Sequence, residues 1–201
     1  MSNLTNTPPP LSLRERKKQR TRATVQGHAL RLFRERGYDN TTVEMISEAA
    51  EVGPATFYRY FPSKADVVLW DEFDPLIVAA FQAQPPDLPA LGALRAAFKT
   101  AFEQMTSQQR QAMQQRSQLA LDVPELRAAM TDQYTQAVGL VAEIAAARTG
   151  KQATDLDVLT FAGAVIGVSM AVMYALADKP GADIPEFLDR ALAQLEGGLA
   201  L

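Results

Sequence analysis

The chain has 201 residues, no cysteine and one histidine, which excludes a disulfide framework, a thiolate zinc site, a cysteine nucleophile and a two-histidine metal site. The net charge of −3 is unevenly distributed, since residues 1–64 hold 11 Lys and Arg against 6 Asp and Glu, whereas residues 65–201 hold 9 against 17. A basic end on an acidic body favours contact of that end with a polyanion; the alternative is a solvated basic arm. No signal-peptide pattern is found in residues 1–13, so we expect a soluble, cytoplasmic protein.

The N-terminal part of the chain divides into a proline-rich and a basic segment. Residues 1–11 contain three consecutive prolines and little periodicity, so we expect a disordered arm. The basic residues that follow are Arg14, Arg16, Lys17, Lys18, Arg20 and Arg22, opposed only by Glu15. We interpret this segment as a basic arm that runs along a DNA backbone or enters a minor groove, with a solvated helix start as the alternative.

From residue 12 onward, apolar residues recur at helical spacing between glycines and prolines, and no stretch alternates with the period of a strand. The clearest apolar stripes are Val25, Ala29, Leu32 and Phe33, then Leu91, Leu94, Phe98, Phe102 and Met105, then Met130, Tyr134, Ala137, Val141 and Ile144, and finally Ile184, Phe187, Leu188, Ala191, Leu192, Leu195 and Leu199. The sequence therefore predicts an all-α fold of about nine helices.

Residues 37–64 have the pattern of two short helices joined by a tight turn. Thr41 or Thr42 can cap the first helix, Thr41 with Glu44 having the spacing of a capping box. The second helix opens at Pro54 and ends near Tyr60, because Pro62 cannot continue it. A short helix, a three-residue turn and a second short helix form a helix-turn-helix pattern.

The second helix carries side chains suited to a DNA groove. Gly53, Pro54, Ala55 and Thr56 are small, so the start of the helix can approach base edges, and its free N–H groups favour phosphate. Hydroxyl, ammonium and guanidinium groups that can donate to phosphates follow. These belong to Tyr58, Arg59, Tyr60 and Lys64. We expect Phe57 and Phe61, four residues apart, to lie in the core.

Over residues 20–66 the sequence resembles the TetR family of bacterial transcriptional repressors. The resemblance is carried by Leu32, Phe33, Gly37, Tyr38, Thr42, Val43, Ile46, Ala49, Ala50, Val52, the run Thr56 to Phe61, Ser63 and Lys64. It implies an N-terminal three-helix DNA-binding domain (12–64) and a C-terminal helical bundle for ligand binding and dimerisation (65–201). It also implies DNA contacts by Thr42, Thr56, Tyr58, Tyr60 and Lys64.

The chain departs from the family pattern at two positions of the turn. Glu51 stands where glycine is usual, and a left-handed conformation there would cost about 1 kcal/mol. Gly53 stands where a capping serine is usual, which weakens the cap by a few tenths of a kcal/mol. Neither change is expected to abolish the motif.

A helix is expected to start near Ser63 and to run toward residue 83, linking the DNA-binding domain to the body. Pro75 lies inside this stretch and should kink or break the helix near residues 71–74. We expect this bend to act as a lever whose response to ligand depends on Pro75.

The body resembles the subset of the family with a C-terminal domain of the mycofactocin-regulator type, on the residues 66–68 and 71–76 and the proline-rich loop after them. That resemblance implies a lipophilic or acyl-CoA-like ligand. Large deformable side chains on these helices could line an apolar pocket, although plain core is the more common role. The candidates are Trp70, Phe73, Phe98, Phe102, Met105, Met130 and Tyr134.

Asp71, Glu72 and Asp74 could form a cation site, but residue 72 points away from the other two on a helix, so we expect neither metal nor cofactor. An all-α enzyme with a carboxylate site here is the alternative from another class. It lacks the paired acid and base with an orienting third group that a catalytic site requires.

Residues 158–177 are uncharged and include the spacing Gly163-x-x-x-Gly167. Their length would allow a membrane span, and a membrane-attached sensor is a further alternative. Polar interruptions and acidic flanks favour instead a helix buried in a core or an interface. Together with the helix 183–199 it would supply half of a dimeric four-helix bundle, as the family resemblance implies. The expected interface residues are Gly163, Gly167, Met170, Leu188, Leu192 and Leu195.

The sequence as a whole predicts a homodimeric, ligand-responsive regulator of transcription that binds a palindromic operator in double-stranded DNA. We expect a repressor, and no enzyme.

Overall fold

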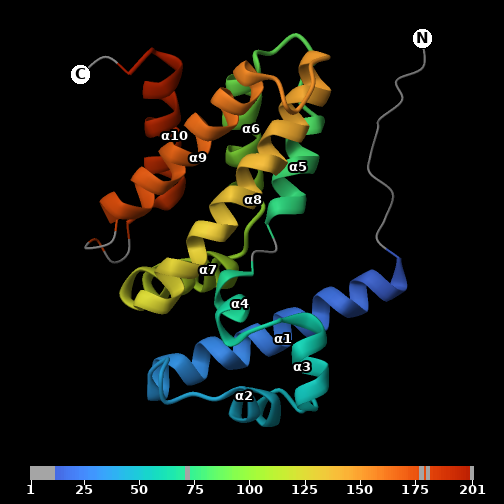
Figure 1. Ribbon diagram of the computed structural model, residues 1–201, viewed down its shortest axis with the longest axis vertical. Helices are drawn as coiled ribbons and strands as arrows, with labels where there is room; N and C mark the ends of the chain where they lie inside the picture. The colour runs from blue at the N-terminus through green and yellow to red at the C-terminus, as the bar shows by residue number, and fades with distance from the viewer. Residues whose placement is uncertain (1–11, 71–72, 177–178, 180–181, 200–201) are drawn as a thin grey trace. The chain divides into compact units, whose positions relative to one another are not determined.

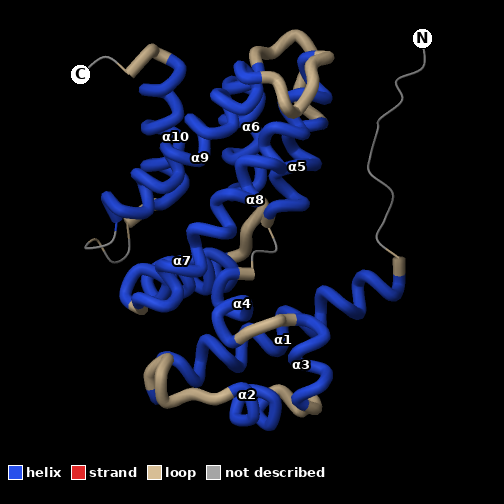
Figure 2. The backbone as a smooth tube through the Cα atoms, in the orientation of Figure 1, coloured by secondary structure: helices blue, strands red, loops and turns tan. Residues whose placement is uncertain are grey.

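The structure, a computed structural model, describes residues 12–70, 73–176, 179 and 182–199. This part of the chain forms ten α-helices and no strand, which confirms the predicted all-α class (Figures 1 and 2). The helices are α1 (Leu13–Arg36), α2 (Val43–Ala49), α3 (Pro54–Tyr60), α4 (Lys64–Leu69), α5 (Asp74–Gln82), α6 (Ala90–Glu103), α7 (Ser107–Asp122), α8 (Pro124–Thr149), α9 (Leu156–Leu176) and α10 (Ile184–Glu196). The arm expected at residues 1–11 lies outside the described residues.

The helices belong to two compact units. One unit holds the described residues up to Trp70 together with Gln108–Ala129, and the other holds Phe73–Ser107 and the described residues from Met130 onward. The first unit thus contains α1 to α4, most of α7 and the start of α8. The sequence predicts a boundary after residue 64 between a DNA-binding and a ligand-binding domain. The two units describe packing and do not test that functional boundary.

The core of the first unit is built on the face of α1 that the apolar stripe predicts. Val25, Ala29, Leu32 and Phe33 are all buried. They share this unit with buried apolar residues of the short helices. Those residues are Ile46, Phe57, Phe61, Val67 and Val68.

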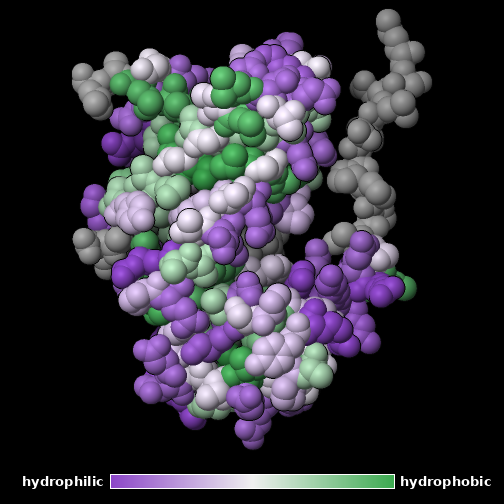
Figure 3. Space-filling model, in the orientation of Figure 1, coloured by the Kyte–Doolittle hydropathy of each residue, from purple (hydrophilic) through white to green (hydrophobic). Residues whose placement is uncertain are grey.

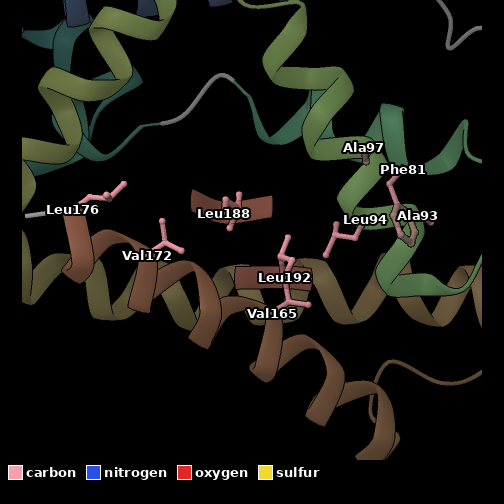
Figure 4. Close-up of a cluster of buried hydrophobic side chains, with 9 residues drawn as sticks. All are labelled: Phe81, Ala93, Leu94, Ala97, Val165, Val172, Leu176, Leu188 and Leu192. Carbon is pink, nitrogen blue, oxygen red and sulfur yellow. The ribbon is translucent and has the colours of Figure 1, made fainter. Parts of the chain in front are cut away.

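The core of the second unit is one apolar cluster formed by α5, α6, α9 and α10 (Figure 4). Its buried members are Phe81, Ala93, Leu94, Ala97, Val165, Val172, Leu176, Leu188 and Leu192. α8 joins α9 through a second, alanine-rich cluster, where Ala142 and Ala145 lie with Ala162.

The stretch expected to form one helix from Ser63 toward residue 83 is interrupted before Pro75, as predicted. α4 starts after Ser63, whose hydroxyl accepts a hydrogen bond from the Asp66 N–H, and it ends at Leu69. Pro75 lies in the first turn of α5, where proline is tolerated because its missing N–H has no helical acceptor. The stretch 63–83 is thus divided into two helices, α4 and α5, and of the kink or break expected near residues 71–74 the structure has the break.

Candidate nucleic-acid interface

The first helix of the motif, α2, is capped by Thr42 and not by Thr41. The Thr42 hydroxyl accepts a hydrogen bond from the Met45 N–H at 3.3 Å, and the Thr42 side chain is exposed. Thr41 is buried, and its hydroxyl donates to the Gly37 carbonyl at 2.8 Å. The capping-box role considered for Thr41 is therefore wrong, because its hydroxyl is used to close the loop between α1 and α2.

The turn between α2 and α3 has the geometry of a Schellman motif. The Val52 N–H donates to the Ser47 carbonyl at 2.9 Å, and the Glu51 N–H donates to the Glu48 carbonyl at 3.1 Å. Glu51 occupies the left-handed position, with φ of 54°. This confirms the left-handed conformation expected at Glu51.

α3 starts after Gly53, which has an extended backbone and makes no side-chain cap, as expected. Phe57 and Phe61 are 0% and 1% exposed, with ring centroids 5.7 Å apart, so both are core residues as predicted. They fix one face of the seven-residue helix against the unit. The opposite face and the N-terminal end of α3 are consequently presented to solvent.

The exposed side of the motif contains most of the residues expected to contact DNA. Those exposed are Thr42, Gly53, Pro54, Ala55, Tyr58 and Arg59, whereas Thr56 and Tyr60 are half-buried. Tyr58 is 51% exposed. The Arg59 guanidinium lies 5.1 Å from the centroid of the Tyr60 ring, which holds it beside that ring. Small backbone-exposing residues and donor side chains thus lie on one side of α3, the arrangement that major-groove reading requires.

Lys64 is half-buried, and its ammonium already has a hydrogen-bond partner within the first unit. Its ammonium donates to the Tyr38 carbonyl at 3.0 Å and lies 4.0 Å from the centroid of the Tyr38 ring. Tyr38 is itself buried, and its hydroxyl donates to a Glu125 carboxylate oxygen at 3.1 Å. Burial, and next the charge of Glu125, raise the pKa of Tyr38 above its ordinary value, so this hydroxyl stays a donor. An ammonium has three donors, so Lys64 can still donate to a phosphate.

A buried hydrogen-bond network at the end of α4, which we call the joint, links the side chains of Arg116 and Gln26 to carbonyls of α4 and Trp70 and is not apparent from the sequence. Arg116 of α7 is only 7% exposed, and its guanidinium donates to the Trp70 carbonyl at 2.8 Å and to the Gln26 side-chain oxygen at 3.4 Å. The Gln26 amide donates to the carbonyls of Val67 and Trp70, both at 2.9 Å. Arg116 lies in a glutamine-rich, weakly amphipathic helix, so no spacing signal marks it as an interior residue.

The basic segment before the motif is a helix and not an extended arm. Residues 14–22 fall within α1, which begins with a complete capping box between Ser12 and Glu15. The Ser12 N–H donates to the Glu15 carboxylate at 2.9 Å, and the Glu15 N–H donates to the Ser12 hydroxyl at 3.2 Å. The alternative of a helix start is thus the correct description of its conformation.

The aromatic and methionine residues expected to line a ligand pocket are divided between the two units. Trp70 belongs to the first unit, where its ring contacts Phe61 and lies under the Arg22 guanidinium. The other six belong to the second unit: Phe73 and Met105 are buried, and Phe98, Phe102, Met130 and Tyr134 are half-buried. The Phe98 and Phe102 rings are stacked with centroids 6.2 Å apart. Asp71 and Glu72 of the considered cation site lie outside the described residues.

The residues expected at the dimer interface separate into surface and core. Gly163 and Gly167 are exposed on α9, and a Cβ atom at either would meet nothing within 4 Å. Met170 and Leu195 are half-buried. Leu188 and Leu192 are 6% and 0% exposed within the protomer's own core, which corrects the expectation that they face a partner (Figure 4).

α9 is long and apolar enough to cross a membrane by length and composition, and 22% of its most apolar window is buried. Several of its large apolar side chains are exposed, with Leu156 at 81%, Leu159 at 40% and Tyr174 at 65%. Apolar residues gather at the surface along this helix in Figure 3.

Comparisons with known proteins agree with this architecture. The family model described as bacterial regulatory proteins of the tetR family matches residues 28–69, and the model for the MftR C-terminal domain matches residues 88–200. The transcriptional regulator TcmR of Streptomyces glaucescens is 35% identical over 159 residues, which cover 76% of this chain and 69% of TcmR.

Two further proteins are similar over almost the whole chain. A Mycobacterium tuberculosis protein named as the mycofactocin biosynthesis regulator MftR is 27% identical over 191 residues, 90% of this chain and 93% of its own length. The structure of Thermus thermophilus FadR, a TetR-family repressor in complex with lauroyl-CoA, has a TM-score of 0.54 and 25% identity, covering 90% of this chain and 95% of FadR. The matched families and relatives are transcriptional regulators and not enzymes. The chain therefore belongs to the TetR family of bacterial transcriptional regulators.

Proposed function

We propose that this regulator is a cytoplasmic homodimeric repressor whose two α3 helices occupy successive major grooves of a palindromic operator. The observation that carries the proposal is the exposed side of the α2–α3 motif. It presents Gly53 to Ala55 at the start of α3, with Tyr58 and Arg59 one turn further on. A helix with a small, uncapped N-terminal end can approach base edges closely and favours phosphate through its free N–H groups.

The donor side chains have separate roles in this proposal. Tyr58, Arg59, Tyr60 and Lys64 donate to phosphates, which fixes the position of the motif on the duplex. Thr42 and Thr56 complete the contacts at the N-terminal ends of α2 and α3. Base recognition then depends on the start of α3, without the capping serine hydroxyl that the family pattern usually supplies there.

The exposed face of α9 supports a homodimer. Besides Asp157 and Thr160, this helix exposes a line of six residues that recur at intervals of three or four and are apolar or small. They are Leu156, Leu159, Gly163, Gly167, Ala171 and Tyr174. Such a stripe pairs two helices closely, because its glycines let the backbones approach. We propose that this stripe buries itself against the partner and not in a bilayer. Fractionation after an alkaline wash tests the membrane alternative, which requires the protein to stay in the pellet.

We further propose that the second unit binds a lipophilic or acyl-CoA-like ligand that releases the operator. FadR of Thermus thermophilus, matched over most of this chain, is a repressor in complex with lauroyl-CoA. The stacked, half-buried Phe98 and Phe102 give α6 an aromatic surface suited to an acyl chain. Release follows when ligand binding favours a conformation in which the two motifs no longer match both half-sites.

DNA binding is tested with a duplex selected by the full-length protein from a random-sequence library. Tyr58→Phe removes one phosphate donor, so we expect operator affinity to fall about three- to tenfold and to fall equally on mutated operators. Thr154→Val is the control, since it removes an exposed side-chain hydroxyl outside both the helix-turn-helix motif and α9. Fluorescence anisotropy measures both variants. A change in sequence preference at unchanged affinity would contradict the phosphate role of Tyr58.

Ligand response is tested with lauroyl-CoA, coenzyme A and laurate added separately to the protein–operator complex. We expect lauroyl-CoA to release the duplex and coenzyme A to have no effect. Phe98→Ala together with Phe102→Ala should raise the lauroyl-CoA concentration needed for release at unchanged ligand-free affinity. Release by none of the three probes would contradict the acyl-CoA proposal and leave DNA binding as a separate result.

A further inference from the structure

The first turns of α1 form a helical segment whose charges the helix-turn-helix motif does not use. Residues 12–20 are all exposed. The capping box at Ser12 and Glu15 starts the helix, and the Thr21 hydroxyl donates to the Lys17 carbonyl within it. These basic side chains are therefore presented on an ordered helix rather than on a flexible chain, which lowers the entropy lost when a partner binds.

The basic residues of this segment occupy two faces. Arg14 and Lys18 are four residues apart, and Arg22 continues the same line, each step turning by about 40° around the helix. Arg16 and Arg20 are also four residues apart and lie roughly 160° away from that line. In the described part of the chain, no carboxylate lies within ion-pair distance of any of these five side chains.

The face of α1 that carries Arg14, Lys18 and Arg22 reaches α3 through Arg22. The Arg22 guanidinium donates to the Tyr60 carbonyl at 3.4 Å, and Tyr60 is the last residue of α3. Arg14 and Lys18 follow Arg22 outward along α1, over about 12 Å. Figure 1 shows α1 running past α3 in this direction. We call Arg14 and Lys18 the basic ridge.

We propose that the basic ridge binds backbone phosphates that flank the groove occupied by α3, so that each protomer contacts the duplex beyond its half-site. The proposal rests on the DNA-binding function proposed above. It is supported by charge complementarity with a polyanion and by continuity with the α3 surface through Arg22. Since phosphate contacts carry no base information, the ridge adds affinity and footprint length without adding sequence preference.

The test compares two double variants of the full-length protein. Arg14→Gln with Lys18→Gln removes the ridge, and Arg16→Gln with Arg20→Gln removes two charges from the opposite face. Both pairs are exposed, and glutamine favours a helix about as well as lysine and arginine do. Each is measured by anisotropy from 0.05 to 0.4 M KCl on two selected duplexes, one with ten base pairs beyond each half-site and one ending at the half-sites.

We expect the ridge variant to lower the salt slope on the long duplex by about two units per protomer, because each phosphate contact contributes roughly 0.9. At 0.15 M salt this equals a loss of roughly 30-fold per protomer. The control pair should change the slope by less than half as much. On the short duplex the ridge variant and the unmodified protein should bind alike.

Equal losses for both pairs, or equal losses on both duplexes, would overturn the proposal and leave only a general effect of net charge. Binding of the ridge to phosphatidylglycerol vesicles, with no effect on the long duplex, would overturn it as well. If the library yields no consistent sequence and Tyr58→Phe has no effect, the proposed DNA function fails together with the ridge. A consistent operator with an unchanged salt slope removes the ridge alone.

Discussion

At the scale of single residues, the turn between α2 and α3 stores backbone strain at Glu51. Its φ of 54° places a residue with a Cβ where a Schellman motif usually has glycine. The strain persists because the neighbouring N–H groups of Glu51 and Val52 both bond to α2 carbonyls. The cost is about 1 kcal/mol, and it falls on the turn that sets the angle between α2 and α3.

Glu51→Gly should raise the free energy of unfolding by about 0.5–1 kcal/mol, because glycine adopts this conformation without a steric penalty. Urea unfolding measures the change. Glu51→Ala is the matched control, since it removes the same charge and keeps the Cβ, so it should give no such gain. Removing the charge should raise DNA affinity alike in both variants. Equal stability of the two variants would show that Glu51 is not strained.

At the scale of helices, α4 ends where its last carbonyls are captured by side chains of other helices. Trp70 has an extended backbone, with ψ of 126°, and its carbonyl accepts from Gln26 of α1 and Arg116 of α7. A continuing helix would need that carbonyl for its own hydrogen bond. The end of α4 is thus determined at Trp70, while Pro75 only begins α5. The lever expected to depend on Pro75 stays a prediction, with Pro75 at the start of α5 and not at the end of α4.

Arg116→Met should lower the free energy of unfolding by about 2 kcal/mol, because the Gln26 side-chain oxygen loses the hydrogen bond from Arg116 inside the unit. Arg127→Met, an exposed arginine at the start of α8, should change it by less than 1 kcal/mol. Urea unfolding and hydrogen exchange at α4 amides measure both variants. An Arg116→Met protein with unchanged α4 protection would exclude the joint as the element that ends α4.

At the scale of the whole molecule, each of the two compact units is built from two separate stretches of the sequence. α7 is grouped mainly with α1 to α4, although α5 and α6 separate them in sequence. Within that unit, Arg116 bonds to α1 and the end of α4, and Glu125 bonds to Tyr38. Under the proposed function, a signal from the second unit would reach the motif through the chain of α7 and α8, whose residues in the first unit bond to α1, Tyr38 and the end of α4.

Gly163→Leu and Gly167→Leu should each abolish the dimer and, with it, tight operator binding, because two linked half-site contacts are needed for affinity. Each protomer should still fold, since a Cβ at either position meets nothing within 4 Å. Gly139→Leu on α8 is the matched control, with the same free space and exposure. Light scattering measures the mass. Stable dimers in both α9 variants would remove this face from the interface.

Local signals in the sequence were sufficient to predict the helices and the motif. Periodicity located the stripe at Val25 to Phe33, and the turn and proline chemistry located α3 and its core residues Phe57 and Phe61. The left-handed Glu51 was expected from the family pattern, which has glycine at that position, and the start of α5 was predictable from Pro75, which lies in its first turn.

Only the tertiary structure determined which residues far apart in the sequence form hydrogen bonds or pack together. Arg116 is 90 residues from Gln26 in sequence, and Tyr38 is 87 residues from Glu125, so no local pattern could pair them. The same reason explains Leu188 and Leu192, which the helical stripe marks as apolar but which only packing against α6 and α9 assigns to the protomer's core. Periodicity shows that a face will be buried, whereas the choice between its own chain and a partner depends on contacts far apart in sequence.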